Sequence, residues 1–307
     1  MFSLLMIFGF SATLGLAIPV SAQEVPREST LIVDIDGRSR QVNPELWNPY
    51  VPGNTWGGGI GGMIREFLFY YNMQNGSYMP WLATGWEYNE DYTGLTVFLR
   101  RGVEWSDGHP FTADDVVFTY KMIMETPGLV PHGAVSALVK EVTKIDDYTV
   151  EFELTKPNPR FHGFAEVFPT TQIGGALVIS PKHIWEGVDP LTFENYPPIG
   201  TGPYELVYAS ETEFRARRLD DWWGTEVFGI RPAPELIIYR LHSTDEIAAM
   251  SIARHDLDSG TDVSVGTWLK LKEMTPYAIV WYKDMPYAHI PHGCERYLDL
   301  TYAKYPW

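Results

Sequence analysis

A glycine-rich run is the first segment whose residue types could bind a ligand. Residues 57–62 read GGGIGG, which satisfies the G-x-G-x-x-G spacing of dinucleotide-binding loops. Such a loop must directly follow a strand, and the turn-forming residues 52–56 (PGNTW) stand there instead. Glycines also let a backbone approach other ligands closely, and the start of a following helix would offer N–H donors. Tyr50 and Trp56 stand beside the run to stack on a ligand or to cover the core, so a ligand-binding loop and an ordinary turn both remain open.

Paired acidic residues are the second candidate for chemistry. Asp-Asp pairs occur at residues 114–115, 146–147 and 220–221. Acid–base hydrolysis needs two carboxylates that face one bond from different directions, about 5–9 Å apart, whereas sequence neighbours point apart. Helix caps and turns explain all three pairs, and no G-x-S-x-G segment is present to anchor a hydrolase triad. We predict no catalytic residue.

Residues 289–294 (HIPHGC) have the types that bind transition metals. A structural zinc site needs four ligands at recognised spacing, and the other six histidines of the sequence form no second cluster. Nothing marks Cys294, the single cysteine, as an activated nucleophile. We therefore predict neither a metal site nor a cofactor from sequence spacing.

The elements that position these residues can be recognised from caps and periodicity. Residues 112–124 are the best-marked helix, with Thr112 as N-cap, Asp115 as its capping-box partner, and Phe111 and Val116 as a hydrophobic staple. A second capping box, at residues 243–246, predicts a helix to about residue 253. Residues 63–71 follow the glycine run with helix-compatible apolar spacing.

Strand patterns alternate irregularly with these helices. They cover residues 31–36, 139–145, 150–154, 204–209, 214–219 and 235–241, and a turn at residues 146–147 joins the second and third into a hairpin. The order has no regular βαβ rhythm, so the predicted class is α+β or irregular α/β.

The first 22 residues are uncharged and largely apolar, and they end in small residues before Gln23. Val20 and Ala22 occupy the −3 and −1 positions of a cleavage site, so the pattern predicts a secretory signal peptide. A membrane anchor is the alternative, although Gly, Ser, Thr and Pro interrupt the apolar run.

Composition limits the partners. The 307 residues include 39 Asp and Glu against 23 Lys and Arg, which gives a net charge of −16. A nucleic-acid-binding protein needs a basic face, so this class is excluded. A hydrophobic share of 45%, with 11 Trp, predicts a folded chain with a substantial core.

One segment carries a family resemblance. Residues 99–116 (LRRGVEWSDGHPFTADDV) closely resemble the signature of the extracellular solute-binding proteins of family 5, the dipeptide/oligopeptide-type receptors of ABC importers. Residues 80–86 (PWLATGW) and 198–204 (PIGTGPY) resemble further motifs of that family, in the expected order. Residues 219–223 (LDDWW) depart from the usual Asn-Pro-x-Tyr-Trp, and residues 254–258 (RHDLD) from the usual Gly-Glu-x-Asp.

The resemblance implies a periplasmic binding protein-like type II (cluster C) architecture in which lobe one is largely present and lobe two is missing. Family members are much longer, so we expect a C-terminal truncation. The expected domains are a signal peptide at residues 1–22, lobe one at residues 23–284, and the approach to the hinge and second lobe at residues 285–307. With half of the cleft absent, the 307-residue form is expected to bind nothing.

The resemblance also implies a function. We expect a periplasmic, secreted receptor without enzymatic activity that delivers peptides or oligosaccharides to the permease subunits of an ABC importer. A secreted glycoside hydrolase and a non-transport sensor module are the alternatives. By analogy the loop at residues 50–59 faces the interlobe cleft, which makes the expected ligand-binding residues Tyr50, Asn54, Trp56, Gly57 and Gly58.

Overall fold

Two four-stranded sheets and a separate hairpin organise the described part of the chain. The computed structural model describes residues 25–35, 42–54, 60–72, 74–165, 167–169, 177–260 and 263–279. Within them the strands are β1 (Thr30–Asp34), β2 (Phe69–Asn72), β3 (Ser77–Pro80), β4 (Ala83–Tyr88), β5 (Gly94–Leu99), β6 (Val139–Asp146), β7 (Thr149–Leu154), β8 (Tyr204–Ala209), β9 (Glu213–Arg218) and β10 (Leu236–Arg240). The helices are α1 (Gly61–Ile64), α2 (Ala113–Glu125), α3 (His132–Leu138), α4 (Lys182–Trp185), α5 (Trp223–Phe228), α6 (Asp245–Ala253) and α7 (Val265–Met274), with short 3-10 turns at Arg27–Ser29 and Phe161–Gly163.

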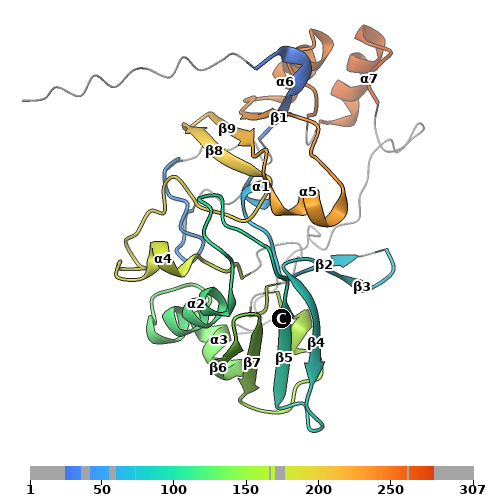
Figure 1. Ribbon diagram of the computed structural model, residues 1–307. Helices are drawn as coiled ribbons and strands as arrows, with labels where there is room; N and C mark the ends of the chain where they lie inside the picture. Colours follow the sequence, from blue (N-terminus) through green and yellow to red (C-terminus); the bar gives the residue numbers. More distant parts are fainter. Residues whose placement is uncertain are drawn as a thin grey trace, which may run out of the picture.

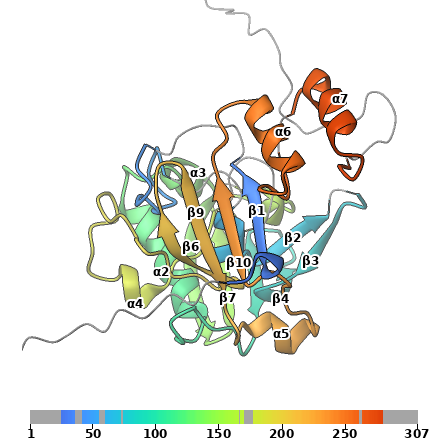
Figure 2. The same cartoon turned by 90° about the horizontal axis from the view of Figure 1, so that it is seen from above.

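The first sheet brings the N-terminal strand beside strands from the second half of the chain. Its order is β1-β10-β9-β8, and β1 runs parallel to β10 while the other pairs are antiparallel. Ile32 lies opposite Ile238, and both pack on Ala248 of α6. Helix α6 therefore packs on side chains of this sheet, and α7 packs against α6. Both helices lie at the top of Figure 1, and Figure 2 shows them near β1 from above.

The second sheet, β4-β5-β7-β6, is antiparallel throughout and lies in the lower half of Figure 1. Alternate residues of its strands are buried, and α2 packs on β6 and β7. The resulting core contains Leu95, Val97, Val150 and Phe152 from the strands and Val116, Tyr120 and Ile123 from α2.

The predicted helix caps show how local sequence sets these elements. The helix over residues 112–124 is confirmed as α2, with the complete capping box between Thr112 and Asp115. Phe111 and Val116, the predicted staple, are both fully buried. The helix after residue 243 is confirmed as α6, but its N-cap is Thr244, one residue later than expected, because the Thr244 hydroxyl accepts the N–H of Ile247.

One predicted helix is wrong. Residues 63–71 form the end of α1, a short extended segment and the start of β2. Phe67, Leu68 and Phe69 are consecutive and all buried, which a single helical face cannot achieve. A turn at Asn75 and Gly76, with Gly76 at φ +72°, pairs β2 with β3 and removes these residues from helix.

The strand predictions are confirmed with small shifts at the ends. Residues 31–36 correspond to β1, the hairpin around residues 146–147 to β6 and β7, and the later strands to β8, β9 and β10. Among the described residues no helix has both the length and the apolar character needed to cross a membrane.

Candidate ligand-binding site

Burial and hydrogen bonds hold the segment before the glycine-rich run against the core. Trp47 is 1% exposed, and its indole N–H donates to the carbonyl of Pro44 at 2.9 Å. The Asn48 amide, fully buried, donates to the carbonyls of Pro190 and Phe193, both at 2.8 Å, while its oxygen accepts the N–H of Tyr50. These bonds hold the start of the loop against the segment around residues 190–193.

Tyr50 anchors the same segment from inside. Its side chain is 1% exposed, and its hydroxyl lies 2.8 Å from both the Val178 carbonyl, to which it donates, and the Ser180 hydroxyl. The ring meets Trp185 of α4 edge-on, with centroids 5.3 Å apart. Burial raises the pKa of the Tyr50 phenol to about 12, so the group is neutral. In the described chain Tyr50 therefore faces the core and supports the loop from beneath.

Of the other four expected ligand-binding residues, only Asn54 lies in the part of the chain that the structure describes. The Asn54 amide donates to the Val51 carbonyl at 2.8 Å, which closes a local turn. Trp56, Gly57 and Gly58 lie outside the described residues. The structure thus brings Tyr50 and Asn54 into one short anchored segment and fixes where the loop begins.

The end of the loop is fixed by a close backbone contact. After Ile60, which is fully buried, α1 lies directly against residues 200–202. A Cβ at Gly200 would lie 1.8 Å from the Ile64 carbonyl oxygen, and one at Gly202 would lie 2.2 Å from the Met63 carbonyl oxygen. The Gly202 N–H donates to the Ile64 carbonyl at 2.9 Å. Residues 200–204 (GTGPY) therefore form the seat on which the end of the glycine-rich loop packs. Only glycine fits at positions 200 and 202 of this seat.

A buried carboxylate lies behind this seat. Glu66 is 4% exposed and accepts two indole N–H groups, from Trp81 at 2.8 Å and from Trp223 at 2.9 Å. The Trp223 indole also donates to the carbonyl of Thr201 at 2.9 Å, as does that of Trp222 at 3.0 Å. Burial raises the pKa of Glu66 to about 7 despite these donors. The carboxylate ties β2–β3, the 200–204 segment and α5 into one unit.

The rings around Glu66 form a continuous layer. Trp81 stacks on Phe228 with centroids 4.6 Å apart, and the Arg100 guanidinium lies 5.8 Å from the Trp223 ring and 5.4 Å from the Phe228 ring. A hollow of about 40 Å³ between Trp105, Thr201 and Trp223 is large enough for water only. Trp105 and Trp223 belong to the hydrophobic core and Trp81 packs against it, so all three serve the scaffold.

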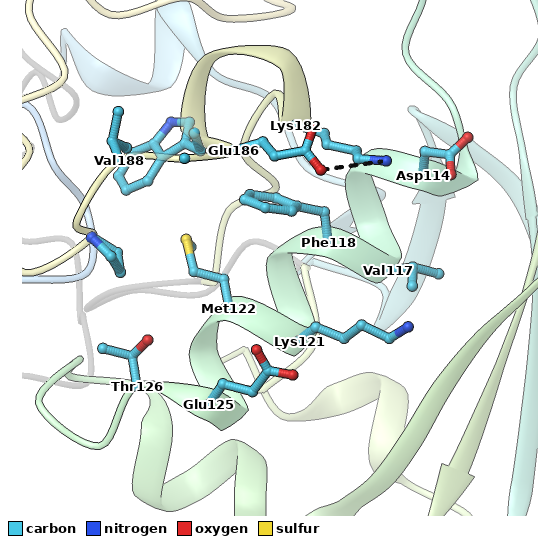
Figure 3. A pocket seen from close by; sticks show the side chains of 13 residues that line it. Asp114, Val117, Phe118, Lys121, Met122, Glu125, Thr126, Lys182, Glu186 and Val188 are labelled. Atoms are coloured by element: carbon cyan, nitrogen blue, oxygen red, sulfur yellow. Dashed lines mark ion pairs between the residues drawn. The ribbon is translucent and has the colours of Figure 1, made fainter.

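A larger hollow lies elsewhere, between α2 and α4. It measures about 460 Å³ and is shown in Figure 3. Its wall combines the apolar Phe118, Met122 and Val188 with charged groups, including the Lys182–Glu186 pair at 4.0 Å. None of the expected ligand-binding residues lines it, and Trp185 separates it from Tyr50.

The acidic pairs have the cap and turn roles expected of them. Asp115 closes the α2 capping box, and Asp146 accepts the N–H of Tyr148 at 2.7 Å in the hairpin turn. Asp220 forms an ion pair with Arg231. The 289–294 segment lies outside the described residues.

Sequence reasoning missed Glu66 and its neighbour Arg65, which is also 4% exposed. Two charged residues inside the apolar run 63–71 were the available signal. Treated as helix, that run places the charges on a solvated face; as an extended segment, both side chains enter the interior. The wrong element assignment therefore hid the buried carboxylate.

Comparisons with known proteins give one consistent result. Residues 77–303 match the family model described as bacterial extracellular solute-binding proteins, family 5 Middle. The periplasmic alpha-galactoside-binding protein of Rhizobium meliloti is 37% identical over 151 residues, covering 46% of this chain and 22% of that protein. The dipeptide-binding protein of Escherichia coli is 29% identical over 231 residues, covering 66% of this chain and 41% of that protein.

Solved structures agree. The mannohexaose-bound periplasmic oligopeptide-binding protein of Thermotoga maritima superposes with a TM-score of 0.72 at 28% identity, covering 86% of this chain and 46% of that one. A second crystal structure of that oligopeptide-binding protein gives a TM-score of 0.73 at 29% identity. The chain spans less than half the length of these relatives.

Proposed function

The chain belongs to the bacterial extracellular solute-binding proteins of family 5, and on that premise we propose that it acts in the substrate-binding component of an ABC importer. Its fold is that of the type II periplasmic binding proteins. In this role the protein captures a peptide or an oligosaccharide outside the cytoplasmic membrane and delivers it to the permease subunits. The observation that carries the proposal is the family match over residues 77–303.

The ligand classes follow from the relatives. An alpha-galactoside-binding protein and a dipeptide-binding protein both match the chain, and mannohexaose is bound in the Thermotoga maritima structure. Peptides and oligosaccharides are therefore the two classes to test. A receptor for peptides needs a charged partner for a chain terminus, whereas one for sugars uses stacked rings and neutral polar groups.

The proposed mechanism is closure on the ligand without covalent chemistry. Two-lobed receptors close around a ligand at a hinge, and only a difference in affinity between open and closed states moves that equilibrium. Residues 23–284 are the proposed lobe one and residues 285–307 the proposed approach to the hinge. The segment from Asn54 to Gly58 is the proposed ligand-facing element and Tyr50 its buried support. Trp56 is the proposed stacking ring, and Gly57 and Gly58 allow close backbone approach.

Support for this loop comes from its anchors. Asn48 and Tyr50 hold its start, and Gly200 and Gly202 hold its end. A loop that is fixed on both sides loses little further conformational freedom when a ligand orders it, which favours binding. Residues 1–22 are the proposed signal peptide, with cleavage before Gln23, which places the protein outside the cytoplasm.

Ligand titration of the full-length protein tests the proposal, with the 307-residue form, which is expected to bind nothing, measured beside it. Mannohexaose, an α-galactoside and a set of dipeptides are titrated separately while intrinsic tryptophan fluorescence is recorded. We expect saturable binding of one class and no turnover of the bound compound. Trp56→Ala should weaken binding, and Trp268→Phe, in α7, is the matched ring control. Hydrolysis of the oligosaccharide, or an absence of binding to every compound, would overturn the proposal.

A further inference from the structure

Three side chains with metal-ligating atoms lie close together on the surface, next to the start of α2. Asp107 and His109 belong to the turn before α2, and His183 belongs to α4. One ligand atom from each lies within 4.8 Å of the others. None of these three side chains bonds to Glu66 or is among the groups that hold the described ends of the glycine-rich loop.

Hydrogen-bond distances and a ring stack hold the three side chains of the cluster close together. His183 Nε2 lies 2.7 Å from Asp107 Oδ2, and His109 Nδ1 lies 3.3 Å from Asp107 Oδ1. The two imidazole rings stack with centroids 3.9 Å apart. Zinc bonds to nitrogen and oxygen are about 2.0–2.2 Å long, so two ligand atoms on one ion stand about 3–4 Å apart. The 3.3 Å contact already has that spacing, and an ion between His183 and Asp107 lengthens their 2.7 Å contact. His109 must leave the ring stack, because the lone pair that binds a metal lies in the ring plane.

The turn that carries Asp107 and His109 is held rigidly. The Trp105 N–H donates to the His109 carbonyl and the Gly108 N–H donates to the Trp105 carbonyl, both at 2.8 Å. Gly108 has a φ of +84°, which a glycine adopts without strain. The Ser106 N–H donates to the Gly200 carbonyl at 2.8 Å, which fixes the turn to the rest of the chain.

One buried carboxylate joins the turn to α4. Asp115 is 4% exposed, and one of its oxygens accepts the Thr112 N–H at 2.9 Å and the Trp105 indole N–H at 3.4 Å. Its other oxygen accepts the N–H of Lys182, the residue before His183, at 2.8 Å. Both segments that supply ligands are therefore positioned by the same group, and such support is what keeps a metal site in geometry.

We propose that Asp107, His109 and His183 form a binding site for a divalent transition-metal ion of the zinc class. Two imidazoles with one carboxylate suit Zn²⁺ and its neighbours, whereas Mg²⁺ and Ca²⁺ require oxygen ligands. The bound ion links the 105–110 turn to α4, two segments far apart in sequence. It therefore stabilises the folded chain, and the gain grows with the logarithm of the free ion concentration above the dissociation constant.

The exposures of the three side chains fit this role. His109 is 58% exposed and has room to turn its ring edge toward the ion, while Asp107 and His183 are 24% and 26% exposed and stay in place. Three protein ligands leave at least one position for water, and the solvent-facing side of the cluster supplies it.

Zinc titration of the metal-free chain tests the site. Binding is measured by competition with a chromophoric chelator, and Co²⁺ is used in parallel because its visible ligand-field bands report imidazole coordination. We expect one equivalent of Zn²⁺ to bind with a dissociation constant of about 1 µM or lower. His109→Ala and His183→Gln should each weaken binding by about tenfold or more and remove the Co²⁺ bands.

Two control chains separate this site from other histidines. His255→Asn replaces a histidine outside the cluster at φ +62°, a conformation that asparagine tolerates, and should bind Zn²⁺ like the unaltered chain. A triple variant, His289→Gln, His292→Gln and Cys294→Ser, removes the other metal-type segment and should also bind normally.

Three results would overturn the site. They are loss of zinc binding in the triple variant, unchanged affinity in both His109→Ala and His183→Gln, and an absence of saturable binding in the unaltered chain. Because His109 is largely exposed, its replacement leaves the fold intact, and circular dichroism confirms that for each variant.

Discussion

Asp115 is the side chain whose removal tests the structural reasoning most directly. It is buried at the start of α2 and accepts N–H groups from three segments, at Thr112, Lys182 and Trp105. Asp115→Ala removes all three bonds at once. Its neighbour Asp114 is in the same helical turn, but its side chain is 47% exposed and pairs with Lys144 at 2.6 Å. Asp114→Ala is therefore the matched control.

Asp115→Ala should lower the free energy of unfolding for two reasons. It removes a side chain of the helix capping box, and it leaves two N–H donors without acceptors. Asp115 is the N3 side chain of the capping box, and losing its bond from the Thr112 N–H costs about 1 kcal/mol. A buried N–H left without an acceptor costs about 1–3 kcal/mol, and this applies to Lys182 and to the Trp105 indole. Burial raises the pKa of Asp115, so its removal relieves some desolvation and offsets part of that cost. We expect a loss of about 3 kcal/mol in the free energy of unfolding.

The control should behave differently because its pair is exposed. A solvent-exposed ion pair contributes about 0–1 kcal/mol, so Asp114→Ala should lose less than about 1 kcal/mol. Urea unfolding followed by tryptophan fluorescence, with a chelator present to keep metal away, gives both values. If the two variants unfold at the same urea concentration, Asp115 does not join the three segments and the reasoning fails.

Three further predictions concern the seat of the glycine-rich loop and its surroundings. Burial raises the pKa of Glu66 to about 7, so between its ordinary value of 4.5 and that value the folded chain holds a proton that the unfolded chain has released. The free energy of unfolding should therefore fall by about 3 kcal/mol as the pH rises from about 4.5 to about 7, and Glu66→Gln should flatten this slope in urea titrations across that range. Gly202→Ala would place a Cβ 2.2 Å from the Met63 carbonyl oxygen, whereas Gly62→Ala meets nothing within 4 Å. The former should lower the melting temperature strongly, by a loss of about 2–4 kcal/mol, and the latter should leave it within error or raise it; equal melting temperatures would contradict the close contact. Tyr50→Phe deprives the Val178 carbonyl and the Ser180 hydroxyl of their partner and should cost about 1–2 kcal/mol in urea unfolding, while an unchanged midpoint would show that water replaces the phenol.

Sequence patterns correctly predicted the helices and strands whose stabilising contacts join residues close together in the chain. The α2 cap and staple were readable because Thr112, Asp115, Phe111 and Val116 act within one turn of each other. The hairpin of β6 and β7 was readable for the same reason, since alternation and a tight turn specify it. The pairing of β1 with β10 was not readable, because it joins residues at opposite ends of the described chain.

The sequence predicted only part of the candidate site. The glycine-rich loop is conspicuous in sequence, but its seat is made by Gly200 and Gly202, whose role depends on a contact with α1. Glu66 was hidden because its burial depends on an extended backbone between α1 and β2, which apolar spacing alone does not distinguish from helix. The burial of Tyr50 follows from its contact with Trp185, which no local pattern contains.

The segment at residues 105–115 shows how a scaffold motif can carry a second property. Trp105 and Asp115 bond to each other, Gly108 makes the turn, and Asp107 accepts a bond from His183, so each of these positions serves the fold. His109 contributes to the turn through its backbone, while its ring is mostly exposed and rests on His183. Its side chain is therefore free to vary without cost to the fold, and an imidazole there completes a set of metal ligands that the scaffold already holds in place.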